Sequence, residues 1–358
     1  MPIQSPLSVG VRIATSAASQ SPTMCSAGGI WPQIGLFCTD FDDTCTSSDT
    51  TPLLPRIAAC LAPDREVSIG STWADLTASF LEGYYGRFKE GMKKVQEDPA
   101  ASVPGKAGLA ELELFLKAME KPEGESMQRV SESRVLANIT REGIKESLRG
   151  PLREEWDLRK HASESLTRVV DAPFDHHIIS LNFSEDVVRT ILEERLGKER
   201  ADAFSIYSND LVYDQDGMAT GEVEVRVKGA IGKRQHFDAL ASAVSQPGAL
   251  TLYVGDSVSD VLAMLSADIG IFIGESSYFH ALVDAFGVQV RPLASVNHRQ
   301  KSCSCRKGEG ERNAGDDCAG TDADTDQHAL VVYQAHSWSE IDALLFGDVN
   351  DGNDQAPA

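Results

Sequence analysis

The chain has 358 residues, which is enough for two domains. Apolar residues make up 42% and charged residues 24%, a globular composition that can supply a sizeable core. The formal net charge is −21, and such a negative field argues against nucleic-acid binding as the main task. Because no apolar run approaches the roughly 20 residues that cross a bilayer, we expect a soluble protein without a membrane partner.

The N-terminal segment and the cysteines bear on location. Residues 1–33 contain no acidic residue and one arginine, Arg12, and are rich in Ser, Ala, Thr and Pro. This composition predicts a disordered tail or a targeting segment, although transit peptides are usually richer in Arg. Seven cysteines at irregular spacing indicate a reducing compartment. We expect a cytoplasmic protein, with the mitochondrion or plastid as the alternative.

Folding signals begin at Ile34. Residues 34–39 form a short apolar run, typical of a strand buried on both faces, and an acidic cluster follows at once. From residue 50 to 171 the pattern predicts an all-helical insert, with a break near residues 97–106. Its first apolar stripe consists of Trp73, Leu76, Phe80, Tyr84, Phe88, Met92 and Val95.

Strands and helices alternate after residue 172. Strands are expected at residues 177–181, 203–207, 250–254, 269–273, 288–290 and 330–333, and a hairpin at 211–227. Helices are expected after Ser184 and around residues 237–244 and 258–265. Alternation of this kind predicts a doubly wound, Rossmann-like parallel sheet. The expected domains are a core (34–49 and 172–346), a helical cap (50–171), a mobile linker (297–327) and disordered ends (1–33 and 347–358).

Charged and polar side chains stand where several of these strands end. The carboxyl ends of parallel strands meet at one edge of a sheet, so we expect the side chains to converge there. Clustered carboxylates are costly unless a cation joins them, and hard oxygen ligands suit Mg²⁺, which in turn favours phosphate oxygens. The candidate residues are Asp40, Asp42, Asp43, Ser180, Lys233, Asp256 and Asp260.

These residues resemble the four motifs of the haloacid dehalogenase-like (HAD) phosphatases. Residues 40–44 match the first motif, Asp-x-Asp-x-Thr, and residues 255–260 match the fourth, Gly-Asp-x-x-x-Asp. Ser180 matches the Ser or Thr at a strand end, and Lys233 matches the Lys before a helix. The resemblance covers about residues 34–333 and implies a HAD core with a C1 cap that closes over the site. Asp43 is a departure, because many members have Gly there.

The resemblance also implies roles for the candidate residues. Asp40 would attack phosphorus and form an aspartyl-phosphate. Asp42 would protonate the leaving oxygen and later take a proton from water. Ser180 would hydrogen-bond the phosphoryl group, and Lys233 would neutralise charge. The implied Mg²⁺ ligands are Asp40, the Asp42 carbonyl and Asp256, with Asp260 in support.

Some segments resemble more closely the phosphatase half of plant thiamin monophosphate phosphatases, in which that half is fused to a TenA-like domain. These segments are residues 41–46, 252–260, 267–271 and 337–341. Too few residues precede Ile34 to hold a TenA-like domain, so we expect a stand-alone phosphatase and a separate TenA-like protein as a candidate partner. The expected substrate is a small phosphorylated metabolite, with thiamin monophosphate favoured.

Other interpretations stay open. A pyrimidine 5′-nucleotidase or a phosphoserine phosphatase would use the same core, and a non-catalytic HAD-fold binding protein would have lost some of the motif residues. The aromatic residues Trp73, Tyr84, Tyr85 and Phe88 could stack on a thiamin cation, but a helical aromatic stripe more often belongs to a core. Cys45 could be a nucleophile, yet Asp40 is better placed, and we expect Cys45 to pack beside the site.

Overall fold

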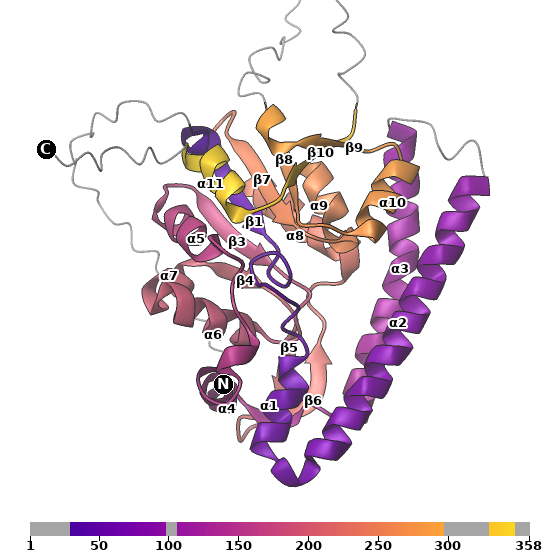
Figure 1. Ribbon diagram of the computed structural model, residues 1–358, viewed down its shortest axis with the longest axis vertical. Coiled ribbons are helices and arrows are strands. Elements are labelled where there is room, and N and C mark those ends of the chain that lie inside the picture. Colours follow the sequence, from indigo (N-terminus) through magenta and orange to yellow (C-terminus); the bar gives the residue numbers. More distant parts are fainter. Residues whose placement is uncertain (1–28, 98–105, 297–328, 348–358) are drawn as a thin grey trace, which may run out of the picture.

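The computed structural model describes residues 29–97, 106–296 and 329–347 (Figure 1). The expected linker at 297–327 lies outside the described residues, as do the expected ends at 1–33 and 347–358 apart from residues 29–33 and 347. Ile30 is buried, and its backbone N–H donates to the carbonyl of Leu344 at 3.1 Å. The packed part of the chain therefore begins before Ile34.

A seven-stranded parallel sheet forms the centre of the molecule, in the order β4-β3-β1-β7-β8-β10-β9. Its strands are β1 (Ile34–Thr39), β3 (Asp175–Ile179), β4 (Ser205–Tyr207), β7 (Leu250–Gly255), β8 (Ile269–Ile273), β9 (Gln289–Pro292) and β10 (Val331–Ala335). The chain adds β3 and β4 on one side of β1 and the later strands on the other, so the strand order reverses at β1. The prediction of a doubly wound parallel sheet is confirmed.

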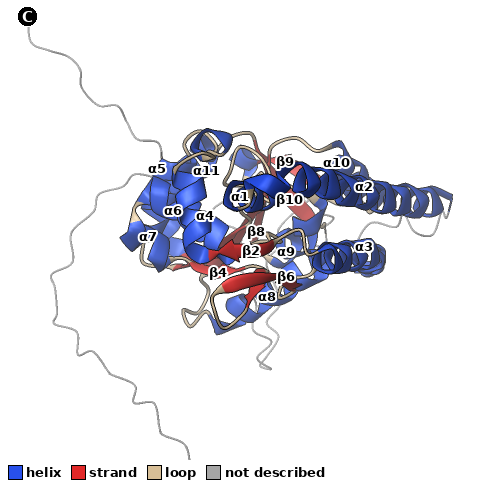
Figure 2. Cartoon of the chain, turned by 90° about the horizontal axis from the view of Figure 1, so that it is seen from below, coloured by secondary structure: helices blue, strands red, loops and turns tan. Residues whose placement is uncertain are grey.

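Two layers of helices cover the sheet because its strands are apolar on both faces (Figure 2). Phe37 of β1 joins one core cluster, while its neighbours Leu36 and Cys38 join the other. The first face is covered by α5 (Ala162–Asp171), α6 (Glu185–Leu196), α7 (Lys198–Ala203) and α11 (Trp338–Phe346). The second face is covered by α8 (Gly229–Ala243), α9 (Val261–Ser266) and α10 (Ser277–Ala285).

A helical insertion follows β1, as predicted. It contains α1 (Leu53–Leu61), α2 (Glu66–Glu97) and α3 (Lys106–Ser133). The long helices α2 and α3 lie side by side and extend along one flank of the core (Figure 1). The expected break coincides with the end of α2 and the start of α3. Among the described helices, α2 included, none is apolar over the length that a membrane span requires.

The expectation that this insert is helical throughout is wrong at one place. After α3 the chain forms β2 (Ala137–Thr140) and then α4 (Arg141–Arg149). β2 pairs antiparallel with β6 (Met218–Glu224), which pairs with β5 (Asp210–Tyr213) as the predicted hairpin. Leu136 and Ile139 are three residues apart, which suits a helix, but it is pairing with the distant β6 that selects the strand.

Candidate active site

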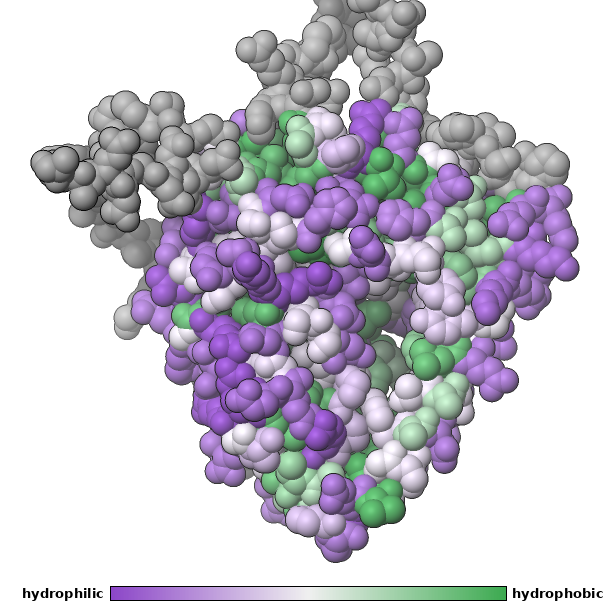
Figure 3. Space-filling view, viewed as in Figure 1, coloured by the Kyte–Doolittle hydropathy of each residue, from purple (hydrophilic) through white to green (hydrophobic). Residues whose placement is uncertain are grey.

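The carboxyl ends of β1, β3 and β7 are neighbours in the sheet, and a cavity of about 500 Å³ lies above them. The cavity is bounded on its other side by α2 and α3, and Figure 3 shows the molecule hollowed between this helix pair and the core. Predicted site residues that line the cavity are Asp40, Asp42, Ser180, Lys233 and Asp256. The structure therefore brings together side chains that are up to 216 positions apart.

Asp40 is held rigidly at the end of β1. Its backbone N–H donates to Val254 of β7 at 2.9 Å, and the Thr39 hydroxyl donates to its carbonyl at 2.8 Å. Its Oδ2 atom lies 2.9 Å from Lys233 Nζ, while its buried Oδ1 atom has no hydrogen-bond partner among the described residues. Burial raises the pKa of Asp40, against the effect of Lys233, and the nearby Asp260 and Asp256 raise it further.

Lys233 lies inside α8, in its second turn, and the prediction that it precedes a helix is wrong. The helix begins at Gly229 without a capping side chain, so no clear start signal stands in the sequence before the apolar periodicity near Phe237. The Lys233 side chain is only 1% exposed, and its Nζ lies 2.7 Å from Asp260 and 2.9 Å from Asp40. Burial lowers the pKa of Lys233, but the two carboxylates outweigh it and raise the pKa above its ordinary value.

Asp260 is fully buried and has its oxygens occupied. Oδ1 accepts hydrogen bonds from Lys233 and from the Tyr253 hydroxyl, the latter at 2.8 Å. Oδ2 accepts from the hydroxyl of Ser257 at 2.8 Å and from its backbone N–H at 3.2 Å. Gly255 allows this packing, because a Cβ atom there would lie 2.4 Å from the Asp260 carboxyl carbon.

An acidic triad is formed by one carboxylate oxygen each from Asp40, Asp256 and Asp260, all within 4.8 Å of one another. Burial, and after it Asp260, raises the pKa of Asp256 to about 7. Its Oδ1 atom accepts a hydrogen bond from the Thr44 hydroxyl at 2.8 Å. Three hard carboxylate oxygens at this spacing fit a small divalent cation such as Mg²⁺, whose charge would offset the crowding of carboxylates.

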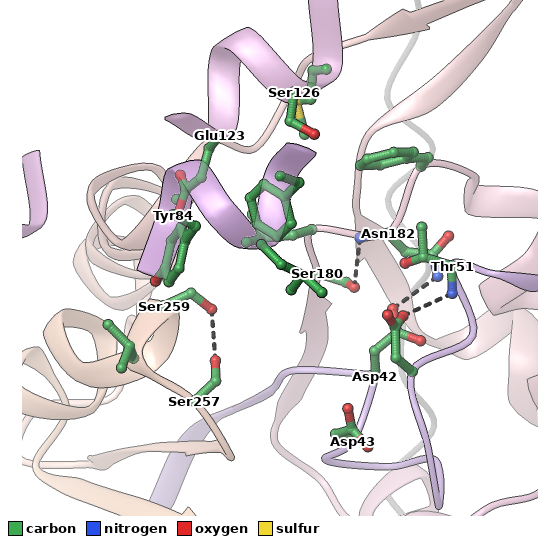
Figure 4. Close-up of a pocket in the computed structure, with 18 of the residues that line it drawn as sticks. Asp42, Asp43, Thr51, Tyr84, Glu123, Ser126, Ser180, Asn182, Ser257 and Ser259 are labelled. Carbon is green, nitrogen blue, oxygen red and sulfur yellow. Dashed lines mark hydrogen bonds between the residues drawn. The ribbon is translucent and has the colours of Figure 1, made fainter. Parts of the chain in front are cut away.

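Asp42 belongs to a separate hydrogen-bond network. Its Oδ1 atom accepts hydrogen bonds from the backbone N–H of Thr50 at 2.8 Å and from the Thr50 hydroxyl at 2.5 Å. Its Oδ2 atom accepts from the Asn182 side-chain amide at 2.8 Å, and Asp42 and Asn182 are labelled in Figure 4. Burial, with help from Asp49, raises the pKa of Asp42 to about 6. Sequence reasoning missed both partners. Asn182 stands two residues after Ser180 at the same strand end, and this position could have identified it as a site residue. No sequence feature marks Thr50 as a site residue.

The loop that follows β1 is fixed by two residues that sequence reasoning assigned no part in the site. Arg159 Nε donates to the Asp43 carbonyl at 2.7 Å, and the indole of Trp338 donates to the Thr44 carbonyl at 2.8 Å. Asp43 has φ 54°, a left-handed conformation that Gly adopts freely and Asp tolerates, which explains the frequent Gly in the family motif.

Cys45 packs under this loop rather than into the cavity. It is fully buried, its thiol donates to the Asp40 carbonyl at 3.2 Å, and burial raises the pKa of the thiol. A thiol held in this way is not an available nucleophile. The expectation that Cys45 packs beside the site is confirmed.

Aromatic side chains form the wall of the cavity on the insertion side. Trp73, Tyr84 and Tyr85 line it, together with Tyr278 of α10, whose ring stacks on Tyr85 at a centroid distance of 4.5 Å. Phe88 is instead buried and packs edge-on against Tyr278. The core interpretation is therefore correct for Phe88, while the other three residues lie at the cavity.

Glu123 of α3 also lines this wall. Burial, and after it Glu120, raises the pKa of Glu123 from 4.5 to about 7, against the effects of Lys233 and Lys228. A carboxyl whose pKa is higher in the folded state retains its proton there while the unfolded chain has lost it. Its contribution to stability is therefore complete below about pH 4.5 and is lost as the pH rises to about 7.

We predict that this pH-dependent loss of stability is absent from the variant Glu123→Gln, whose side chain has no titratable carboxyl group. Between about pH 5 and pH 8 the melting temperature of wild type should fall relative to that of Glu123→Gln, and the fall should level off above about pH 7. Thermal unfolding in one buffer series measures the difference. Glu125→Gln, on an exposed position of the same helix, is the matched control. If the melting temperatures of wild type and Glu123→Gln differ by the same amount at every pH in this range, the prediction is wrong.

No family model matches the chain. The sequence is 27% identical over 319 residues to a protein of Arabidopsis thaliana named "Bifunctional TH2 protein, mitochondrial", covering 86% of this chain and 48% of that protein. The chain thus spans about half the length of this curated relative.

Solved structures with a similar arrangement have low sequence identity. A phospho-aspartyl intermediate analogue of phosphoserine phosphatase is 17% identical, with a TM-score of 0.41 over 70% of this chain and 91% of that chain. A substrate-bound phosphoserine phosphatase complex is 17% identical, with a TM-score of 0.42 over 70% and 90%. A Bordetella pertussis protein of unknown function is 16% identical, with a TM-score of 0.43 over 71% and 96%.

The topology of the chain itself, rather than these structural matches, indicates its fold. A seven-stranded parallel sheet reverses its order at β1, a helical insertion follows β1, and the four motif positions meet at one sheet edge. The chain therefore has the topology and motif arrangement expected of a HAD-like phosphatase fold with a C1-type insertion, and its sequence is similar to that of the plant bifunctional TH2 protein.

Proposed function

We propose that the protein is a Mg²⁺-dependent phosphatase that hydrolyses a small phosphomonoester through an aspartyl-phosphate. The observation that carries the proposal is the buried Asp40 Oδ1 atom, which lies at the cavity and has no partner among the described residues. A carboxylate oxygen without a partner among the described residues, in a side chain whose other oxygen is paired with Lys233, supports the assignment of Asp40 as the nucleophile that attacks phosphorus.

Hydrolysis would proceed in two displacements. Asp40 attacks phosphorus, so that a new O–P bond forms as the ester O–P bond breaks, and Asp42 donates its proton to the departing oxygen. Asp42 then takes a proton from water, which attacks the aspartyl-phosphate and releases inorganic phosphate. A pKa of about 6 lets Asp42 serve in both protonation states near neutrality. Thr50 and Asn182 orient it through three hydrogen bonds.

The other site residues would position the phosphoryl group and offset its charge. Ser180 lines the cavity and would donate a hydrogen bond to a phosphoryl oxygen. Mg²⁺ would be held by Asp40, the Asp42 carbonyl and Asp256, and when bound it would supply positive charge opposite the phosphoryl oxygens. Asp260 would act in support, because its oxygens already bond to Lys233, Tyr253 and Ser257.

Thiamin monophosphate is the favoured substrate. Support comes from the resemblance of the segments around the motifs to plant thiamin monophosphate phosphatases, and from the aromatic wall of the cavity. We also propose a cytoplasmic location, since Cys38, Cys45 and Cys60 form no disulfide among the described residues. A separate TenA-like protein is the proposed partner.

Phosphoserine is the second candidate substrate. Glu123 and Lys228 both line the cavity and could bind the ammonium and carboxylate of a serine leaving group. The size of the cavity, about 500 Å³, and its aromatic lining suit a larger group better.

A panel of phosphate esters tests the proposal. We expect phosphate release from thiamin monophosphate to exceed that from phosphoserine and from pyrimidine nucleotides by at least about tenfold in kcat/KM, and to stop when EDTA removes Mg²⁺. Restoring Mg²⁺ after chelation is the control. Turnover that survives chelation would contradict the metal-dependent mechanism, and equal rates on all esters would contradict the substrate assignment.

A further inference from the structure

A partly buried carboxylate on the insertion side of the cavity has no part in the hydrolysis described above. Glu123 comes from α3 and lies across the cavity from Asp42 (Figure 4). Its Oε2 atom is buried and has no hydrogen-bond partner among the described residues. Burying a carboxylate oxygen without a partner is costly, so this position suits a ligand group that carries positive charge or N–H donors.

The balance of charge in the cavity points the same way. Carboxylates outnumber lysines among the lining residues, and no arginine is found among the described residues that line it. Lys233 is already paired with Asp40 and Asp260, while Lys228 is exposed, and in the described part of the chain no ion pair joins it to Glu123. The acidic lining residues are Asp40, Asp42, Asp43, Asp49, Glu123 and Asp256. A leaving group that added negative charge would be repelled here.

The aromatic wall lies beside Glu123. Side chains of α2 that line the cavity recur at three- and four-residue steps from Trp73 to Tyr85, a distance of about 18 Å along the helix. Tyr84 lies next to Glu123 in Figure 4, and Glu123 contributes, after burial, to raising the pKa of Tyr84. Aromatic faces attract organic cations, so this ring and this carboxylate act on the same part of a ligand.

We propose that Glu123, together with the aromatic residues of α2, is a specificity determinant that binds a leaving group which is both aromatic and positively charged. The inference rests on the proposed function, because it assigns the leaving-group side of the same cavity. Glu123 attracts the cationic nitrogen while the rings of α2 stack on the leaving group, and the phosphate is directed toward Asp40.

Substrate selectivity in a charge-neutral variant tests the inference. The probes are thiamin monophosphate, which has a cationic aromatic leaving group, and p-nitrophenyl phosphate, which has an aromatic leaving group without a cation. In Glu123→Gln the ratio of kcat/KM for the first ester to that for the second should fall roughly tenfold, since only the cationic ester loses a charge-assisted contact. Glu125→Gln, exposed on the same helix, is the matched control and should keep the wild-type ratio.

A ratio that changes by less than about twofold in Glu123→Gln would overturn the inference. If the rates on both esters fall equally at such a constant ratio, Glu123, which lies against Gly229 at the start of α8, serves only to join the insertion to the core. Thermal unfolding confirms that each variant is folded before the rates are compared.

A binding measurement separates this inference from the proposed function. Thiamin, the alcohol without phosphate, should bind the wild type in calorimetry, and Glu123→Gln should weaken that binding roughly tenfold. If thiamin binds in this Glu123-dependent way but no ester is hydrolysed, the proposed function fails and the inference stands. If esters are hydrolysed but thiamin does not bind, or binds equally well to wild type and Glu123→Gln, the inference fails and the phosphatase proposal stands.

Discussion

Replacing Asp40 by Asn is expected to lower phosphate release more than about a thousandfold while the protein stays folded. Asn has the same shape and keeps an oxygen that can accept from Lys233 Nζ, which lies 2.9 Å from Asp40. It also removes one of three crowded carboxylates, so folding should not suffer. What the amide lacks is a nucleophilic oxygen that can form the aspartyl-phosphate.

The measurement compares initial rates on the best ester with thermal unfolding of the same samples. Asp43→Asn is the matched control, because it removes a charge from the same loop and Asn tolerates the left-handed conformation at φ 54°. We expect this control to retain most of the activity. A folded Asp40→Asn variant with near-normal turnover would exclude a covalent mechanism through Asp40, and phosphate found by mass spectrometry on a different residue would exclude Asp40 as the nucleophile.

Replacing Lys233 by Met should destabilise the fold by about 3–5 kcal/mol, in addition to abolishing activity. Lys233 is 1% exposed and is the cation between Asp40 and Asp260, which are 8% and 0% exposed at their side chains. Removing it leaves two buried carboxylates facing each other without compensation. Part of the loss should be recovered by adding Asp260→Asn, which removes one of the unpaired charges.

Urea unfolding at neutral pH and without divalent ions measures this effect. Lys198→Met is the control, since it breaks an exposed ion pair with Asp202 and should leave stability nearly unchanged. Stability of Lys233→Met within about 1 kcal/mol of wild type would show that the buried charges do not depend on Lys233. In that case the proposed role of Lys233 in neutralising the nucleophile would also be wrong.

The sheet and the motif positions could be predicted because their signals are local. Runs such as residues 34–39 and 269–273 are apolar throughout, which marks strands covered on both faces, and each is followed by a change to polar sequence. Parallel strands that end in this way bring their last residues to one edge. The convergence of Asp40, Ser180 and Asp256 therefore follows from the order of strands and polar residues along the chain.

Other features depended on partners far along the chain. The sequence of β2 has the spacing of a helix, and its strand conformation depends on pairing with β6. The helix α8, which contains Lys233, begins without a capping side chain. Thr50 and Asn182 have ordinary sequence surroundings, and their contact with Asp42 exists only once the two strand ends meet. Trp338 belongs to a segment that carries the family resemblance, but no local pattern predicts its bond to the Thr44 carbonyl.

Sequence alone determined the fold class, the order of the motifs, and which acidic residues and which lysine converge. Hydrophobic periodicity and strand ends depend on residues close together in the chain, so they can be recognised without the structure. Only the tertiary structure decided which carboxylate oxygens have hydrogen-bond partners and which, as at Asp40 and Glu123, have none among the described residues. Hydrogen-bond satisfaction is a property of three-dimensional packing around an atom, and no local pattern encodes it.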